Sequence, residues 1–293
     1  MAPQAAWLQG TAGRRLHLQH GPIDLVLQAW GAAEAEEGAY RRAWQRFQTI
    51  LEELVAELPL LRQPLGAVQP LPRGSTARRM TMACWPHRGM FITPMAAVAG
   101  AVADEILQAM TGEPGLRKAY VNNGGDIALR LGPGENFTTG LVGNLAQPHI
   151  DAVARIEADA GIGGIATSGW RGRSFSRGIA DAVTILAASA AQADAAATIV
   201  ANAVNAEHPA IRRMPANKLK DDSDLGDIPV TENVGVLPTS LVLEALSAGL
   251  AVAHDLQSSG AIQAACLTLQ GETVVADRGR AEKRVLMSAG GGR

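Results

Sequence analysis

The sequence predicts an α+β protein of mixed architecture, with antiparallel sheet segments and packed helices. Segments with helical apolar spacing and short strand-like segments are both present, and they do not alternate one for one along the chain. From Lys118 onward, short strands separated by turn-rich segments dominate. No repeat of fixed period is visible. Together these observations favour an α+β fold over a doubly wound parallel sheet.

Length and composition indicate a folded globular protein. The chain has 293 residues, of which 47% are hydrophobic and 18% charged. This length allows one large domain or two interlocked domains. We expect a single domain over residues 1–293, with a frayed tail at 280–293. The formal net charge of -2 produces no field that attracts nucleic acid or an anionic membrane, so we expect neither as a partner.

The first part of the chain alternates between sheet and helix signals. Apolar and polar residues alternate on both sides of Gly21-Pro22, which predicts a hairpin. A long amphipathic helix follows and stops at Pro59, and Pro94 suits the first turn of a second helix. The expected elements are strands at 15–20 and 23–28, a helix at 34–58, a loop at 64–74, a strand at 81–85 and a helix at 94–110.

The second part of the chain carries the short strands. Its alanine-rich segment before Val204 is predicted to be helical, because high helix propensity outweighs its few β-branched residues. Gly260 marks the end of a later helix. The expected elements are strands at 119–121, 127–131, 152–156 and 182–186, a helix at 190–204, a polar loop at 216–229, a helix at 239–256 and a hairpin at 262–275.

Cysteine usage and the absence of a targeting signal predict a cytoplasmic protein. Cys84 and Cys266 are the only cysteines and have no metal-ligand spacing, so we expect both to be buried apolar residues in a reducing compartment. The first residues show no signal-peptide pattern. The most apolar stretches, 94–103 and 182–193, are too short to cross a bilayer.

A strand that runs into paired glycines and an acid is the first segment with chemical potential. Paired glycines let a backbone approach a ligand closely, and the neighbouring amides and carboxylate offer directional hydrogen bonds. The candidate cofactor-binding residues are Asn122, Asn123, Gly124, Gly125 and Asp126. Asn-Gly is also a common hairpin turn, and this alternative stays open.

A second segment combines small residues, hydroxyl groups and arginines. Residues 161–169 contain four glycines, and Arg171, Arg173 and Arg177 follow. Guanidinium groups match phosphate oxygens, and free backbone amides add donors, so we expect an anion-binding loop. A flexible, solvated arginine loop is the alternative. The candidate cofactor-binding residues here are Thr167, Ser168, Gly169, Arg171 and Arg173.

The third segment lies on the expected helix at 190–204. A spacing of four residues brings Asp194 and Thr198 to one face, and Asn202 and Asn205 continue this polar stripe. A carboxylate and a hydroxyl are oxygen ligands that Mg²⁺ prefers, with substrate phosphates and water completing its octahedron. We therefore expect Asp194 and Thr198 to be metal-binding and catalytic. The alternative is that Asp194 only stabilises the start of the helix.

In this order, the three segments resemble the ApbE-like superfamily, whose best-known members are Mg²⁺-dependent flavin transferases that move FMN from FAD to a protein threonine. The family motif Asn-x-Gly-Gly-Asp is similar to residues 122–126, and Ala-Asp-Ala-x-x-Thr is similar to 193–198. The family's Thr-Ser-Gly is similar to 167–169, and its glycine-rich helix start resembles 92–104, including Gly100 and Asp104. The resemblance implies a T-fold-related α+β architecture, Mg²⁺ and FAD or FMN as cofactors, and a cofactor-binding role for Asp104.

The sequence also departs from the family pattern. Thr93 stands at the family aspartate, and Ala99 stands at the family lysine. The family segment His-Ile-Ile-Asp-Pro-Arg-Thr-Gly has no counterpart after Gly169. A cation and a histidine that would neutralise a diphosphate and move a proton are therefore missing. The resemblance is to an uncharacterised cytoplasmic branch, in which we expect flavin transfer to protein to be weak or absent.

Two hypotheses of function follow. The first is an enzyme that binds FAD or a related diphosphate cofactor with Mg²⁺ and acts by phosphoryl or nucleotidyl (FMN) transfer, with a protein acceptor as a second partner. The second is a non-catalytic flavin- or pterin-binding protein. Retention of Asp194 and Thr198 favours the enzyme, and loss of the lysine and histidine favours the binder. The sequence leaves the oligomeric state open, a homo-oligomer included.

Overall fold

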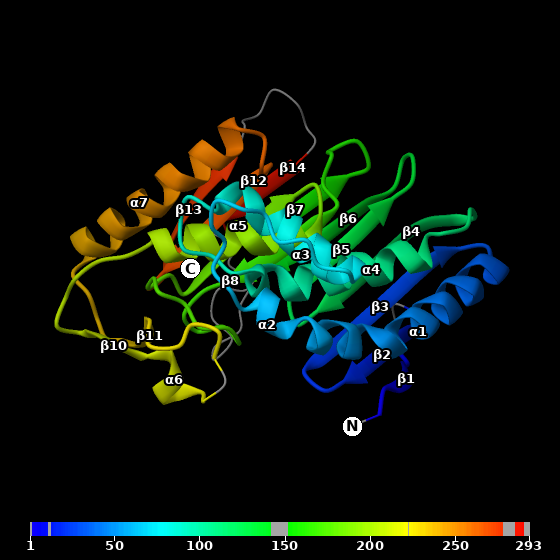
Figure 1. The fold of residues 1–293 in the computed structure, drawn as a ribbon. Coiled ribbons are helices and arrows are strands. Elements are labelled where there is room, and N and C mark those ends of the chain that lie inside the picture. Colours follow the sequence, from blue (N-terminus) through cyan, green and yellow to red (C-terminus); the bar gives the residue numbers. More distant parts are fainter. Residues whose placement is uncertain (1, 11–12, 142–151, 222, 278–284, 290–293) are drawn as a thin grey trace. The chain divides into compact units, whose positions relative to one another are not determined.

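The computed structural model describes residues 2–10, 13–141, 152–221, 223–277 and 285–289 (Figure 1). It divides into two compact units whose segments interleave along the chain. Unit 1 comprises 1–137, 157–166 and 187–195, and unit 2 comprises 138–156, 167–186 and 196–293. The last boundary along the chain, between residues 195 and 196, falls inside helix α5 (Ala190–Ala203). The single-domain expectation stays a prediction.

Unit 1 is built on an antiparallel sheet. The strands β1 (Gln4–Leu8), β2 (Arg15–His20), β3 (Ile23–Gly31), β4 (Leu116–Asn123) and β5 (Asp126–Leu131) pair in this order. The start of β8 (Gly164–Ser168) then pairs with β5. In β2 and β3 every second side chain is buried, which is the signature of a sheet with one face on a core. The predicted hairpin at 15–28 is confirmed.

The helices that link β3 to β4 in the chain belong to unit 1. They are α1 (Ala33–Ala56), α2 (Leu58–Leu61), α3 (Ser75–Cys84) and α4 (Val98–Met110), with short 3-10 turns at Trp85–His87 and Pro94–Ala97. Helix α1 contacts β2 and β3, and α4 contacts α1, β4 and β5. The helices predicted at 34–58 and 94–110 are confirmed, the second with a 3-10 first turn.

The prediction of a strand at 81–85 is wrong, because residues 81–84 form the last turn of helix α3 and Trp85 begins the following 3-10 turn. The buried residues of α3 include Ala77, Met80, Thr81 and Cys84, which share one helical face. That face packs on α4 and on the turn at Pro94–Ala97. Packing of this face therefore overrides the local β propensity of a five-residue window.

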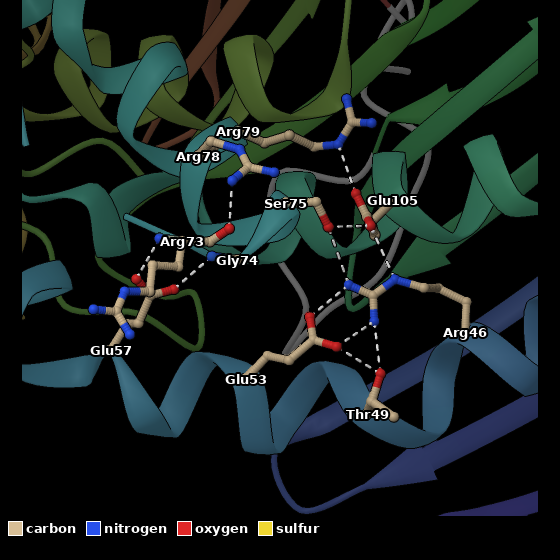
Figure 2. A network of polar contacts seen from close by, with 10 residues as sticks. All are labelled: Arg46, Thr49, Glu53, Glu57, Arg73, Gly74, Ser75, Arg78, Arg79 and Glu105. Atoms are coloured by element: carbon tan, nitrogen blue, oxygen red, sulfur yellow. Dashed lines mark hydrogen bonds and ion pairs between the residues drawn. The ribbon is translucent and has the colours of Figure 1, made fainter. Parts of the chain in front are cut away.

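A buried polar network joins α1, α3 and α4 (Figure 2). Glu105 of α4 accepts hydrogen bonds from Arg46 Nε at 2.9 Å and from Arg79 Nε at 3.0 Å. Arg46 also pairs with Glu53 on its own helix, at 2.7 Å. Opposite charges around the carboxylate and its hydrogen bonds from Ser75, Arg79 and Arg46 lower the pKa of Glu105 despite its burial.

Unit 2 contains antiparallel strands and a helix that packs on them. The strands β9 (Ala182–Ala187), β12 (Ala264–Leu269) and β13 (Glu272–Asp277) pair in this order. Helix α7 (Thr239–Ser258) packs on β12 and β13. By length and composition alone α7 would be able to span a membrane, and it is the one helix of the described residues with that property. Its contacts are those of a helix covering a sheet.

Smaller elements complete unit 2. The strands β10 (Ile211–Pro215) and β11 (Pro229–Val234) form an antiparallel two-stranded ribbon. The short helix α6 (Ala216–Leu219) lies between them in the chain. The strands β7 (Ala152–Glu157) and β14 (Val285–Ala289) pair, and β6 (Asn136–Leu141) is the third strand of their sheet. Part of the expected frayed tail is therefore a strand. Residues 280–284 and 290–293 of that tail lie outside the described residues.

Candidate functional site

The paired glycines form the two-residue turn between β4 and β5. In this turn Gly124 has φ +65° and Gly125 has φ +115°. Residues other than glycine rarely adopt such positive φ angles. The amide oxygen of Asn122 accepts a hydrogen bond of 2.9 Å from the Gly125 N–H. The hairpin interpretation of the Asn-Gly segment is thus correct for the local structure. Whether the same turn also approaches a ligand stays a prediction.

The register of this hairpin separates the two asparagines. Asn123 pairs with Asp126 across the turn, and successive strand residues point to opposite faces of the sheet. Asn123 is buried, and its amide nitrogen donates to the Ala99 carbonyl at the start of α4, at 3.0 Å. Asn123 and Asp126 therefore lie on the side of the sheet that α4 covers, whereas Asn122 faces the other side.

Asp104 caps another helix of its own chain. Its two carboxylate oxygens accept hydrogen bonds from the N–H groups of Ala190, at 3.0 Å, and Ala191, at 2.9 Å. These donors belong to the first turn of α5, where backbone N–H groups lack partners within the helix. Asp104 is 8% exposed, and burial raises its pKa against the opposing effect of the two hydrogen bonds. The structure thus gives Asp104 a helix-capping contact that the sequence did not predict.

Asp194 is held at the start of α4. Its Oδ2 accepts a hydrogen bond of 3.0 Å from the Gly100 N–H. Gly100 has no room for a side chain, because an added Cβ would overlap the backbone of Ala190 and Ala191. The backbones of α4 and α5 are therefore in direct contact beside the carboxylate.

Electrostatics around Asp194 oppose its ionisation. Burial raises the pKa of Asp194 well above its ordinary value, and the nearby Asp126 charge raises it further. Hydrogen bonds from Gly100 and Ala99 act in the opposite direction, and Asp104 adds a smaller unfavourable charge. A proton on Asp194 or a cation beside it would relieve this unfavourable balance. The Cys84 thiol nearby is buried, and burial and Asp194 raise its pKa, so it is not a nucleophile.

The carboxylates of Asp126 and Asp194 suit a hard cation that also binds water or phosphate oxygens. Within the described residues, no group of three or more His, Cys, Asp or Glu side chains has metal-binding geometry. Mg²⁺ is commonly held by one or two carboxylates, with water and substrate phosphates completing the shell. The Asp126 and Asp194 pair fits that pattern and does not fit a closed structural metal site.

The glycine-rich segment at 161–169 differs from the loop that was expected. Residues 164–168 form β8. An added Cβ on Gly163 would overlap the Ala188 carbonyl, and one on Gly164 would overlap the backbone of Ala190. One on Gly169 would overlap the Asp181 carbonyl. These glycines allow close backbone packing, and residues 164–168 form a strand instead of a loop. The anion-binding role expected for this segment stays a prediction.

The hydroxyl and arginine candidates belong to unit 2. The hydroxyls of Thr167 and Thr184 share a hydrogen bond of 2.8 Å. Arg171 donates from Nε to Asp181 at 2.7 Å and stacks on the Trp170 ring. Ser168 is half-buried, and Arg173 is exposed. The bond to Asp181 and the stacking on Trp170 therefore hold the Arg171 side chain in one position.

Thr198 and the polar stripe of α5 complete the set. Thr198 is half-buried and belongs to unit 2, whereas Asp194 belongs to unit 1. Further along α5, the Asn202 amide oxygen accepts a hydrogen bond of 2.9 Å from the Arg177 N–H. Asn205 contacts Arg213. Contacts with neighbouring backbone and side chains thus account for the C-terminal part of the stripe.

The structure brings Asp104, Asn123, Asp126 and Asp194 together in unit 1. Convergence of this group with the candidates of unit 2 stays a prediction. Sequence reasoning missed Gly100 and the backbone groups of Ala99, Ala190 and Ala191. The spacing of four residues between Gly100 and Asp104, which puts both on one helical face, was the available signal.

The sequence is similar to that of a known protein family and to archaeal relatives. Residues 5–275 match the sequence model of a family described as AbpE bacteria. A UPF0280 protein from Methanothrix thermoacetophila is 36% identical over 158 residues, which is 54% of this chain and 65% of that protein. A UPF0280 protein from Methanopyrus kandleri is 37% identical over 131 residues, which is 45% of this chain and 51% of that protein. The matched region thus spans about half to two thirds of these relatives.

The fold is also that of a solved structure. The crystal structure of the ApbE protein from Thermotoga maritima superposes with a TM-score of 0.51. The match covers 94% of this chain and 97% of that one, at 14% sequence identity. At this identity the likeness concerns the fold, and it confirms the α+β, ApbE-like architecture expected from the sequence.

Proposed function

The chain belongs to the AbpE bacteria family, and from this premise we propose that it binds FAD, or a related diphosphate-bearing cofactor, together with a divalent cation such as Mg²⁺. The observation that carries the proposal is the Asp126 and Asp194 pair. Burial and the nearby charge of Asp126 make the Asp194 carboxylate costly to ionise, and a cation beside the two carboxylates would remove that cost. The proposed reaction class is phosphoryl or nucleotidyl transfer.

In this proposal, acidic and hydroxyl side chains bind the cation, and arginine side chains are the candidates for binding phosphate. Asp194, with Thr198 one helical turn away, supplies protein oxygens to the cation, which when bound neutralises charge on the leaving phosphate. In unit 2, Arg171 donates to Asp181 and Arg173 is exposed, and the expectation that these two guanidinium groups bind phosphate oxygens stays a prediction. The turn at Asn122–Asp126 supplies Asp126, the second carboxylate beside Asp194. Its two glycines have no side chains that would keep a ligand away from the backbone.

The alternative is a non-catalytic flavin- or pterin-binding protein, and one observation favours it. Ala99 stands where the resembled family has a lysine, and its carbonyl is occupied by Asn123. The start of α4 therefore offers no side-chain cation to a leaving phosphate. A protein of this kind would keep the cofactor site and lose turnover.

A single incubation separates the two functions. Purified protein is mixed with FAD and Mg²⁺, with and without a threonine-bearing acceptor protein, and FMN, AMP and covalent flavin are followed by chromatography. AMP release with FMN, or with flavin bound to protein, supports the enzyme. Retention of intact FAD supports the binder. Covalent transfer at about 1 per second or faster would show that the missing lysine and histidine are dispensable.

A further inference from the structure

Helices α4 and α5 each place an aspartate at the N-terminus of the other. Asp104, in the second turn of α4, binds the N–H groups of Ala190 and Ala191. Asp194, in the second turn of α5, binds the N–H of Gly100. A carboxylate at a helix start satisfies unpaired donors and interacts favourably with the helix dipole. The two helices are therefore capped reciprocally by residues of each other.

From this reciprocity we infer that Asp104 is a positioning residue for Asp194 and not a ligand-contacting group. Both Asp104 oxygens are occupied by α5 N–H groups, and the side chain is 8% exposed. The inference rests on the proposed function, in which Asp194 is the carboxylate that meets the cation. Asp104 acts on that carboxylate by fixing the first turn of the helix that carries it.

The packing between the two helices explains why the two caps are coupled. Ala190 and Asp194 are separated by about one helical turn, so a shift of the first turn of α5 displaces the Asp194 carboxylate. Gly100 sits against Ala190, where an added Cβ would overlap backbone atoms. The contact thus allows one close arrangement, with a capping carboxylate on each side of it.

Two variants on neighbouring positions of α4 test this inference. Asp104→Asn and Glu105→Gln each replace a buried carboxylate with an amide of equal size. Glu105 pairs with Arg46 of α1 and Arg79 of α3 (Figure 2), whereas Asp104 makes the hydrogen bonds to α5. Glu105→Gln therefore controls for the general destabilisation that follows loss of a buried charge.

The first measurement is amide hydrogen exchange by NMR on the metal-free full chain. Asp104→Asn is expected to speed exchange of the Gly100 amide by about tenfold, because its partner Asp194 loses its fixed position. Glu105→Gln is expected to leave the Gly100 amide protected relative to other α4 amides. An equal change of the Gly100 amide in both variants, or no change in Asp104→Asn, would overturn the inference.

The second measurement is calorimetric titration with Mg²⁺ alone at a temperature where all proteins are folded. Asp104→Asn should raise the Kd for Mg²⁺ by about tenfold, the usual effect of losing a group that orients a metal ligand. Glu105→Gln should not change it. If the wild type binds Mg²⁺ and Asp104→Asn binds it equally well, the inference fails and the proposed function stands.

Failure of the proposed function gives a different pattern. A wild-type protein that binds no Mg²⁺ contradicts the cation in the proposal, while the exchange measurement still decides whether Asp104 positions Asp194. Should Asp104→Asn fold in low yield, Asp104→Ser serves in the same two measurements, because a short hydroxyl cannot replace two hydrogen bonds.

Discussion

The carboxylate of Asp194 lies close enough to that of Asp126 for the charge of Asp126 to raise the pKa of Asp194. One residue comes from a helix and the other from the strand after a glycine turn, 68 positions apart in the chain. The pairing is a product of the fold of unit 1. The free-energy cost of ionising Asp194 beside Asp126 is the reason to expect a bound cation.

Asp194→Asn should weaken Mg²⁺-dependent FAD binding by about tenfold or more, roughly 1.4 kcal/mol, because Mg²⁺ needs a protein carboxylate. Fluorescence titration of FAD with and without Mg²⁺ measures this. Thr198→Val is the milder control, since water can replace a neutral hydroxyl. Identical FAD affinities for wild type and Asp194→Asn, whatever the Mg²⁺ concentration, would reduce Asp194 to a helix-capping residue.

Without divalent cations, Asp194→Asn should melt at a higher temperature than the wild type at neutral pH. The pKa of Asp194 is raised in the folded state above its ordinary value of 3.8. The folded protein therefore binds more protons than the unfolded chain, and the wild type loses stability as the pH rises from about 4 through the folded pKa. Below this window the two proteins should melt alike. Calorimetric melting between pH 3 and pH 8 checks the trend, and a gap between the variants that widens toward acid would contradict it.

Gly100→Ala should destabilise the protein by about 1–3 kcal/mol, the usual cost of overpacking. The added Cβ would overlap the backbone of Ala190 and Ala191, which cannot move aside as a flexible side chain can. Gly89→Ala is the matched control, because no atom lies within 4 Å of a Cβ added there. Urea unfolding of both variants gives the comparison. A stable Gly100→Ala protein would show that the α4 and α5 backbones are not in direct contact.

Glu105→Gln should cost about 2–3 kcal/mol at pH 7, less than a fully buried pair, because Arg46 and Arg79 are partly exposed. The pKa of Glu105 is lowered in the folded state from its ordinary value of 4.5. Its contribution is therefore present above pH 4.5 and is lost as the pH falls through the folded pKa. Urea unfolding at pH 7 and pH 3 should show the difference shrinking in acid. An equal difference at both pH values would exclude the charge as its cause.

Much of the local structure was predictable from the sequence. Periodicity, helix propensity and turn signals together located the hairpin at 15–28, the helices α1, α4, α5 and α7, and several later strands. Local signals failed where packing overruled them, as in α3, or where glycines serve backbone contact, as in β8. Strand β1 has the sequence Gln-Ala-Ala-Trp-Leu, in which apolar and polar residues do not alternate, so no strand pattern marks it.

The sequence by itself determined the α+β class, the resemblance to the ApbE-like superfamily and the identity of Asp126 and Asp194 as unusual polar residues. Each of these depends on residue type and on spacing within one element. Only the tertiary structure decided that Asp104 caps α5, that Asn123 binds Ala99 and that Asp126 acts on Asp194. The physical reason is that hydrogen bonds and Coulomb interactions depend on distance in space. The number of residues between two positions in the chain does not determine their distance in space when they lie on different elements.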